Sequence, residues 1–214
     1  MNSKASYGEL KSKPTLREDK VLQRQSSILR AVLDVISQQG LTGITMGAIA
    51  KAAGCSFGVV AFHFKSKEGV ILAALDYLAE EYDQQRRQVI SPTATPLENL
   101  NALIENDFDT HVCTPRSAAL WLAFWAESVR VESYRKKCAD IKARYIELDG
   151  ELISALAKQR SLNLDSTFVA HSLNALIHGL WTSNLVLRNT GVEWQKLSKN
   201  SCRDLLRSYF PDDF

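Results

Sequence analysis

Apolar residues recur every three or four positions along most of the chain, which is the spacing of one face of a helix. The pattern predicts amino-terminal helices over residues 19–39, 46–53, 56–64 and 66–89. Gly40 ends the first of these, and Ile28, Val32 and Ile36 form part of its buried stripe. No alternating strand pattern flanks a hairpin dipeptide, so we expect an all-α fold.

A segment rich in proline and threonine, Ser91–Pro96, interrupts the helical pattern and is the clearest linker in the chain. Beyond it the apolar positions predict five more helices. They cover residues 97–112, 115–129, a long helix that carries Ile141 and ends near 159, one that Asp165 caps and that ends at Gly191, and 194–210. The sequence therefore predicts about nine helices and no internal repeat.

The second and third predicted helices are short and close together. Gly54 lies between them and can adopt a positive φ without steric cost, and Ser56 can cap the helix that follows. Two short helices that cross through a glycine turn form a helix-turn-helix, whose second member can lie in the DNA major groove. This pair indicates double-stranded DNA as a partner.

Charge is distributed unevenly along the 214 residues. Residues 1–70 carry ten Lys/Arg and five Asp/Glu, whereas the remaining 144 carry sixteen and nineteen, although the net charge is only +2. A chance fluctuation is the alternative, but the basic excess coincides with the helix-turn-helix, as expected of a nucleic-acid head. We expect a flexible basic arm over 1–19, a DNA-binding domain over 20–68, and a ligand-binding and dimerisation domain over 69–214.

The four cysteines are far apart and have no histidine at ligand spacing, so we expect free thiols and no metal site. The first twenty residues lack the apolar core of a signal peptide. The longest apolar run, Val70–Leu78, is broken by Asp76 and is too short to span a bilayer. We therefore expect a cytoplasmic protein without a membrane partner.

The stretch from Ile28 to Gly69 resembles the DNA-binding head of TetR-family transcriptional regulators. The residues in register with that family are Ile49, Ala50, Gly54, Ser56, Gly58, Phe64, Lys67 and Glu68. Members of the family bind operator DNA as twofold dimers, so the resemblance implies two recognition helices in successive major grooves. One position differs: Ala61 stands where these recognition helices usually have a tyrosine.

Early, outward residues of the third helix are the candidates for reading bases. Phe57 has no hydrogen bond to give, so we expect it to contact a thymine methyl group, and Gly58 would allow a close approach. The candidate DNA-binding residues are Thr45, Lys51, Ser56, Phe57, Gly58, Ala61, Phe62, His63, Lys65 and Lys67. For Lys51 and Lys65 an ordinary solvated surface position is the alternative, and His63 could instead bond a backbone carbonyl.

Three segments of the carboxyl-terminal part resemble the BetI-like subgroup, the repressors of betaine synthesis that respond to choline. They are FD at 108–109, WLAFWAES at 121–128 and ALIHGLW at 175–181. That subgroup also has a small residue at the position of Ala61. The BetI-like repressors have an acidic residue, however, where this chain has His178. The resemblance therefore does not by itself identify the ligand of this chain.

Aromatic residues on several helices could surround a ligand. Trp121 and Trp125 lie one turn apart on one helix and Trp181 lies on another, and converging rings attract a cation. The candidate ligand-binding residues are Asp107, Phe108, Trp121, Trp125, Glu127, Tyr145, His178 and Trp181. The alternatives are a plain aromatic core and a Glu127 that faces water. Because His178 replaces an acid, the effector is either a choline-like cation or an anionic or neutral molecule.

The last two predicted helices supply the expected dimer interface, as in the TetR family. Its candidate residues are Leu173, Leu176, Leu180, Leu187, Leu197 and Leu205, which give two apolar faces for a four-helix bundle across a twofold axis. A monomer whose faces only cover the pocket is the alternative.

A ligand-responsive DNA-binding repressor, assembled as a homodimer without a cofactor, is the leading hypothesis. A DNA-binding dimer without a ligand is the second hypothesis. An all-helical enzyme is the third, although the sequence has no catalytic constellation, glycine-rich phosphate loop or metal spacing.

Overall fold

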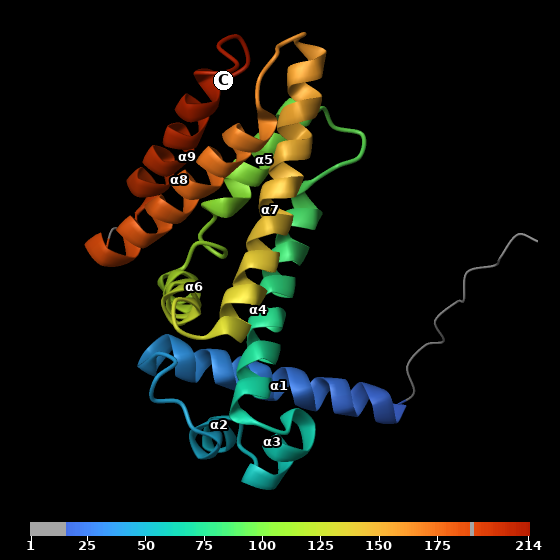
Figure 1. Ribbon diagram of the computed structural model, residues 1–214, viewed down its shortest axis with the longest axis vertical. Helices are drawn as coiled ribbons and strands as arrows, with labels where there is room; N and C mark the ends of the chain where they lie inside the picture. The colour runs from blue at the N-terminus through green and yellow to red at the C-terminus, as the bar shows by residue number, and fades with distance from the viewer. Residues whose placement is uncertain (1–15, 189–190) are drawn as a thin grey trace, which may run out of the picture.

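The computed structural model describes residues 16–188 and 191–214, which form nine α-helices without a strand (Figure 1). The helices are α1 Leu16–Gln39, α2 Met46–Ala52, α3 Phe57–Phe64, α4 Lys67–Val89, α5 Pro96–Asp107, α6 Pro115–Ser128, α7 Glu132–Gln159, α8 Ser166–Leu187 and α9 Val192–Arg207. The all-α prediction is confirmed. Most of the expected basic arm lies outside the described residues, and α1 begins inside its last part, at Leu16.

Three helices end earlier than their apolar spacing predicts. Helix α8 ends at Leu187 rather than at Gly191, α9 ends at Arg207 rather than at residue 210, and α5 is the third. The helix expected over 97–112 is α5, which ends at Asp107. The backbone N–H of His111 donates to Oδ1 of Asp109 at 2.8 Å, and the N–H of Cys113 donates to the Asp109 carbonyl at 2.9 Å. An aspartate side chain that bonds the backbone two residues ahead favours a turn, and this turn replaces the last turn of the predicted helix.

Most helix starts are fixed by hydrogen bonds that can be read from the sequence. A hydroxyl group caps α2, α3, α4, α5 and α6 by accepting the backbone N–H three residues ahead; the capping residues are Thr45, Ser56, Ser66, Thr95 and Thr114. Proline occupies the first position of α5 and α6, where its missing N–H costs nothing. These local signals explain why the predicted starts agree closely with the structure.

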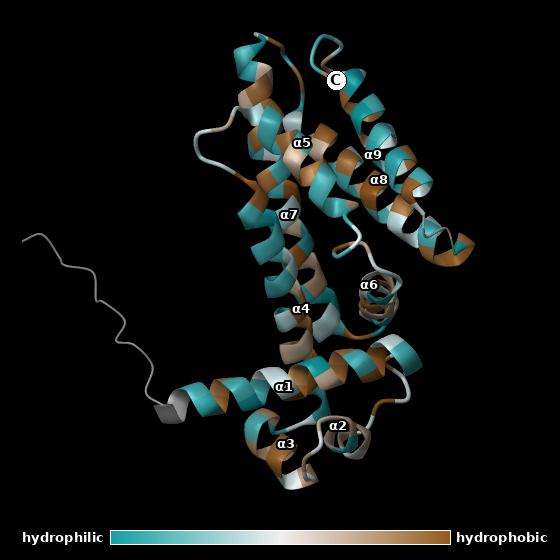
Figure 2. Ribbon diagram, turned by 180° about the vertical axis from the view of Figure 1, so that it is seen from behind, coloured by the Kyte–Doolittle hydropathy of each residue, from teal (hydrophilic) through white to brown (hydrophobic). Residues whose placement is uncertain are grey.

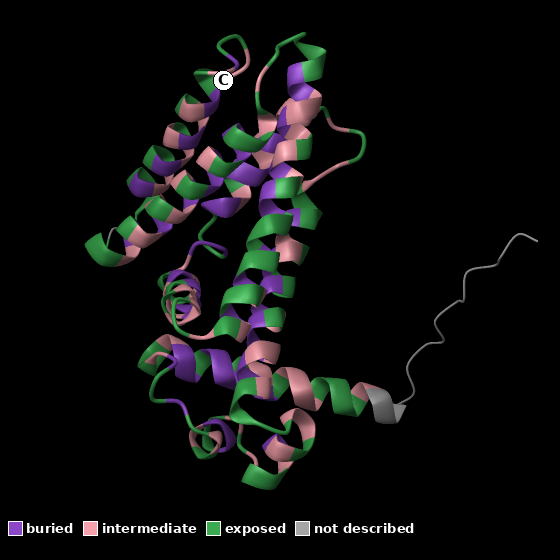
Figure 3. Cartoon of the chain, in the orientation of Figure 1, coloured by how far each residue is buried: buried purple, intermediate pink, exposed green. Residues whose placement is uncertain are grey.

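Helix α4 is the central element of the molecule. It runs upright beside α7, while α1 crosses its lower end and α2 and α3 lie below α1 (Figure 1). Helices α5, α8 and α9 lie near the upper parts of α4 and α7 (Figure 1). Buried positions line the helix sides that face α4 and α7 (Figure 3). We call α1–α3 the head and α5–α9 the body, and one apolar core continues from the head into the body. Head and body therefore share α4 rather than meeting through a linker.

Hydrophobic residues lie mainly on the inner sides of the helices and hydrophilic residues on the outer sides (Figure 2). None of the described helices combines the length and the apolar composition that a membrane span requires. Only α2 and α3 taken together meet that composition, and they are bent by 109°.

Polar contacts tie the head to the lower ends of α6 and α7. Asp34 on α1 forms an ion pair with Arg116 at the start of α6, with 2.7 Å between Oδ1 and Nη2. Ser133 Oγ, at the start of α7, donates to Oε1 of Glu68 at 2.5 Å. Both contacts are exposed and individually weak. They nevertheless fix which parts of the body touch the head.

Gly69, in the first turn of α4, lies where a side chain would collide with α3. A Cβ at this position would come well within 3.0 Å of the Phe64 carbonyl oxygen. We expect Gly69→Ala to lower the free energy of unfolding by about 1–3 kcal/mol, because α4 must move away from α3. Gly47→Ala, whose Cβ would meet its nearest atom at 3.9 Å, is the matched control. Equal thermal unfolding of both variants would contradict this close approach.

Candidate functional site

Helices α2 and α3 meet at 109° across a four-residue turn. Gly54 has φ +60° in this turn, and the N–H of Cys55 donates to the carbonyl of Ala50 at 2.9 Å. An angle of this size and a glycine in the turn are the geometry of a helix-turn-helix. The pair predicted from the sequence is present, and α3 is its second helix.

Helix α3 exposes large aromatic side chains. Phe57 is 59% exposed and Phe62 is 80% exposed, whereas Val60 is buried in the head core. The ring of His63 meets the ring of Phe62 edge-on, with 5.2 Å between their centroids. Exposed apolar surface of this size on a short helix is not explained by folding and indicates contact with another molecule.

The predicted DNA-binding residues lie on α2, α3, the turns beside them and the first position of α4. Lys51, Lys65 and Lys67 are exposed, and so are Gly58 and the cap residues Thr45 and Ser56. Lys65 has φ +62°, a strained conformation for a lysine, at the junction of α3 and α4. Cations, helix starts and exposed rings therefore gather on one short stretch of chain, although their contacts with DNA stay a prediction.

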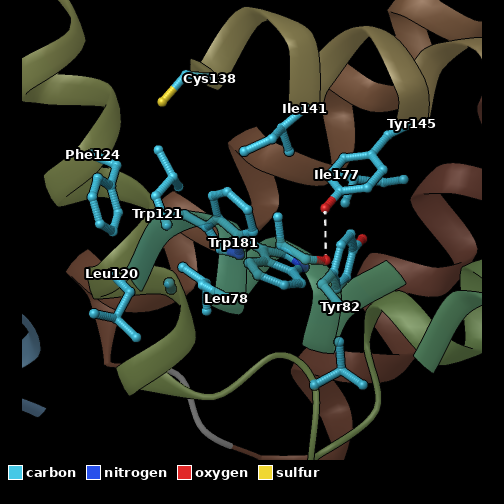
Figure 4. Close-up of a cluster of buried hydrophobic side chains, with 14 of the residues drawn as sticks. Leu78, Tyr82, Leu120, Trp121, Phe124, Cys138, Ile141, Tyr145, Ile177 and Trp181 are labelled. Carbon is cyan, nitrogen blue, oxygen red and sulfur yellow. Dashed lines mark hydrogen bonds between the residues drawn. The ribbon is translucent and has the colours of Figure 1, made fainter. Parts of the chain in front are cut away.

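A small cavity lies between α4, α6, α7 and α8. Its walls are Tyr82, Trp121, Trp125, Cys138, Ile141, Lys142, Tyr145, His178 and Trp181. The space between these walls is about 10 Å³, which holds the centre of roughly one water molecule. Figure 4 shows the rings of Trp121, Trp181 and Tyr82 converging below Ile141 and Tyr145. The aromatic side chains therefore fill nearly all of the space between these four helices.

The rings of the cavity pack in a continuous chain. Trp121 stacks on Trp125 with 6.1 Å between centroids, and Trp125 lies 4.6 Å from the ring of His178. Tyr82 meets Trp181 edge-on at 6.0 Å and Tyr145 at 5.0 Å. Five residues predicted to bind a ligand, the three tryptophans, Tyr145 and His178, therefore meet in one place.

His178 is unusual among the cavity walls. Its Nδ1 atom is buried and has no hydrogen-bond partner among the described residues. Burial, together with the charges of Lys142 and Arg86, lowers the pKa of His178 to about 3. The ring is therefore neutral at neutral pH and leaves one nitrogen without a partner.

A buried ionic network lies beside the cavity. Arg86, only 3% exposed, donates from Nη1 to Asp107 Oδ2 at 3.1 Å and from Nη2 to Asp149 Oδ1 at 2.5 Å. The Tyr82 hydroxyl donates to Asp107 Oδ1 at 2.6 Å, and Trp181 Nε1 donates to the Asp107 carbonyl at 2.9 Å. Both carboxylates are thus engaged by Arg86, and Asp107 reaches the cavity only through Tyr82 and Trp181.

Three predicted ligand-binding residues do not line this cavity. Asp107 lies in the ionic network, and Phe108 is fully buried with its ring edge-on to Trp194 at 5.8 Å. Glu127 forms an ion pair with Arg130 one turn ahead. Partners of this kind cannot be read from helical spacing, because they depend on which side chains folding brings together.

Sequence reasoning missed four cavity walls, Tyr82, Cys138, Ile141 and Lys142. Tyr82 follows Leu78 on the buried stripe of α4, so the pattern gave only the signal of a core residue. Lys142 is an exposed cation next to a buried isoleucine, and nothing in the sequence distinguishes it from other surface lysines.

A second cavity of about 250 Å³ shares Tyr82, Trp121 and Trp181 with the first. Its remaining walls include Glu81, Gln85, His111, Arg116 and Ser117. Because the same three rings border both spaces, they act as a partition between them.

The predicted dimer leucines are not equivalent. Leu187 is 64% exposed and Leu197 is 60% exposed, whereas Leu176, Leu180 and Leu205 are half-buried. Leu173 is buried in the core of its own chain, so it is not available at the surface. Val186 at the end of α8 and Val192 at the start of α9 are exposed as well. The ribbon is coloured hydrophobic in this region (Figure 2).

Helix α8 also presents a row of small residues to solvent. Ala175, Gly179 and Ser183 are exposed and follow one another at intervals of four. A Cβ placed on Gly179 would meet no atom within 4 Å. Sequence reasoning concentrated on leucines and missed this row, although its spacing was visible.

Two family models match the chain. One, described as bacterial regulatory proteins of the tetR family, matches residues 28–74. The other, described as the carboxyl-terminal part of BetI-type transcriptional repressors, matches residues 96–211, which is more than half of the chain. The chain belongs to the TetR family. Its body is of the BetI type, as the resemblance of its motifs implied.

Curated relatives agree with this assignment. The HTH-type transcriptional regulator BetI of Proteus mirabilis is 29% identical over 161 residues, which are 74% of this chain and 78% of the relative. BetI of Ectopseudomonas mendocina is 28% identical over 162 residues, covering 74% and 80%. This TetR-family chain is therefore a transcriptional regulator.

Solved structures share the fold. A transcriptional regulator of Pseudomonas aeruginosa superimposes with a TM-score of 0.80 at 22% identity and covers 88% of this chain and 90% of its own. A regulator of Saccharomonospora viridis, solved in complex with choline, has a TM-score of 0.73 at 22% identity and covers 87% and 96%. TetR-family regulators bind operator DNA as dimers and respond to a small-molecule effector.

Asp149 gives the buried network a pH dependence. Burial raises the pKa of this carboxyl to about 6, against the attraction of Arg86. The folded state therefore binds this proton more readily than the unfolded state, so the contribution to stability grows as pH falls through 6. Relative to Asp149→Asn, the wild type should gain about 1 kcal/mol of unfolding free energy between pH 7 and pH 5.

Urea unfolding of wild type and Asp149→Asn at equal protein concentration measures this difference. Because carboxyl groups outside the Arg86 network titrate alike in both proteins, their contributions cancel. Stability curves that run parallel between pH 7 and pH 5 would show that Asp149 does not hold the proton.

Proposed function

We propose that this TetR-family regulator is a repressor that binds operator DNA as a homodimer and leaves it when a small molecule enters the aromatic cavity. The observation that carries the proposal is the span of α4. Its first turn lies against the end of α3 at Gly69, and its later turns supply Tyr82 to the cavity and Arg86 to the ionic network. One continuous helix therefore connects the recognition helix with the ligand site.

On the DNA side, α3 enters the major groove with its exposed face. Phe57 contacts a thymine methyl group, and the bare backbone of Gly58 allows a close approach. Lys51, Lys65 and Lys67 contact phosphates, as does the start of α2 at Thr45, where free N–H groups attract an anion. Exposure of these residues supports the proposal.

On the effector side, a ligand larger than water must push the aromatic rings apart, because the cavity is nearly filled. Tyr82 would then press on α4 and Trp121 on α6, and the start of α6 pairs with α1 of the head through Arg116 and Asp34. The ligand releases DNA only if it binds the DNA-incompetent arrangement of the two heads more tightly.

The dimer forms through α8 and α9. The small residues Ala175, Gly179 and Ser183 let α8 of one subunit approach α8 of the other closely, and Leu187 and Leu197 bury their exposed side chains beside them. A twofold arrangement of these faces gives the four-helix interface that places both recognition helices on one side of the dimer.

A catalytic role is not part of the proposal. The relatives are transcriptional regulators, and the two buried carboxylates are held by Arg86 rather than directed into the cavity.

Charge reversal at Lys67 tests the DNA-binding surface. We expect Lys67→Glu to weaken binding to all DNA sequences alike and to reduce the slope of log affinity against log salt by about 1, because one phosphate contact is lost. Fluorescence anisotropy with labelled DNA from upstream of the encoding gene measures both. Lys158→Glu, at the end of α7 away from the head (Figure 1), is the control. An unchanged slope for Lys67→Glu would remove Lys67 from the interface.

A bulky charge on α8 tests the dimer. Gly179→Arg should give monomers that keep their helical content but bind operator DNA at least about tenfold more weakly, because two linked heads bind more tightly than one. Sedimentation velocity measures the assembly and anisotropy the affinity. The control is Ala126→Arg on the exposed side of α6. A dimeric Gly179→Arg variant would place the interface elsewhere.

A further inference from the structure

The charges around the cavity limit what its effector can be, if the effector enters there as proposed above. Nine residues line the cavity, and none of them is acidic. Lys142 is the one charged residue among these walls, at the exposed rim, and His178 is neutral within them. A cation placed among the rings would find no counter-charge in the wall.

Two buried carboxylates lie beside the cavity but are not among its walls. Asp107 and Asp149 are held by Arg86, whose guanidinium lies 5.7 Å from the ring centroids of both Tyr82 and Tyr145. Arg86 therefore offsets the carboxylates behind these two walls. Asp83, near Tyr145, pairs with Arg144, with 3.4 Å between Oδ2 and Nη2.

His178 supplies a polar atom that nothing in the folded chain uses. Its buried Nδ1 has no partner among the described residues, and its ring lies 4.6 Å from that of Trp125 inside the cavity. A buried polar atom without a partner is unfavourable, so a ligand that bonds it gains affinity. In the neutral ring this nitrogen can carry the proton and donate to an oxygen.

We propose that the effector carries a carboxylate, held by the Lys142 ammonium and His178 Nδ1, with a compact group packed among the three tryptophans. The compact group is either a trimethylammonium or an apolar cluster of methyl groups, because both fit aromatic walls. The carboxylate is the feature that both kinds of effector share. A choline-like alcohol would instead bring a cation toward Lys142 without an anion to offset it.

Four probes of nearly equal shape separate these chemistries. Trimethylglycine and 3,3-dimethylbutanoate carry a carboxylate next to a trimethylammonium or a tert-butyl group. Choline and 3,3-dimethylbutan-1-ol have the same two groups next to an alcohol. Titration of the tryptophan fluorescence of the full dimer measures binding, and anisotropy of labelled upstream DNA measures release.

We expect at least one carboxylate to bind about tenfold or more tightly than its matching alcohol, because an ionic hydrogen bond replaces a neutral one. The comparison of the two carboxylates identifies the compact group. Choline binding more tightly than trimethylglycine, or no binding by any of the four probes, would overturn the carboxylate proposal.

Three variants assign the effect to residues. Lys142→Gln should remove the advantage of the carboxylates, whereas Lys136→Gln, on the same helix with a side chain 71% exposed, should keep it. His178→Glu places an anion beside Trp125 and should make choline the tighter ligand. Unchanged preference in Lys142→Gln and His178→Glu would contradict the assignment.

The two readouts separate this inference from the proposed function. If choline binds best and releases DNA, the regulator works as proposed and only the carboxylate is wrong. If a carboxylate binds best and the dimer stays on DNA, the cavity chemistry is right and effector-driven release is wrong.

Discussion

The guanidinium of Arg86, buried between the carboxylates of Asp107 and Asp149, joins α4 to α5 and α7. Loss of one partner from such a group leaves an uncompensated charge, at a cost of about 3–5 kcal/mol. Asp107 also accepts hydrogen bonds from Tyr82 and Trp181, so two cavity walls depend on the same anchor. The shape of the aromatic cavity therefore follows from an ionic contact outside it.

This anchor determines how α4 can transmit a signal. Its upper part is fixed by the network, and its lower end is pressed against α3, where Gly69 leaves no room for a side chain. A rigid helix held at one end can change the head only by tilting. The exposed pair between Asp34 and Arg116 is weak enough to yield when α6 moves. In the proposed mechanism the buried Arg86 network is the point about which α4 tilts, and the exposed Asp34–Arg116 pair breaks.

The sequence predicted local features better than tertiary ones. Hydroxyl caps and the glycine turn are short-range, so the helix-turn-helix was recognised. Helix ends were predicted less well, and at Asp109 an unrecognised turn ended α5 early. The three tryptophans, singled out by resemblance to the BetI-like subgroup, lie around one cavity, and their contact with a ligand stays a prediction. The position of Asp107 depends on Arg86, which is one turn of α4 beyond Tyr82 and looked like an ordinary surface cation. Long-range pairing of this kind has no period in the sequence.

Shape and charge of the cavity are set by different residues. The aromatic rings come from α4, α6, α7 and α8 and belong to the core, so they cannot change without loss of stability. Lys142 lies at the rim, and His178 is a neutral ring with one unused nitrogen. Replacing Lys142, or introducing a charged residue in place of His178, alters the charge that a ligand meets while leaving the aromatic walls in place. Because a buried charge without a partner costs several kcal/mol, such a replacement can reverse which ligand binds while the route from cavity to DNA head stays the same.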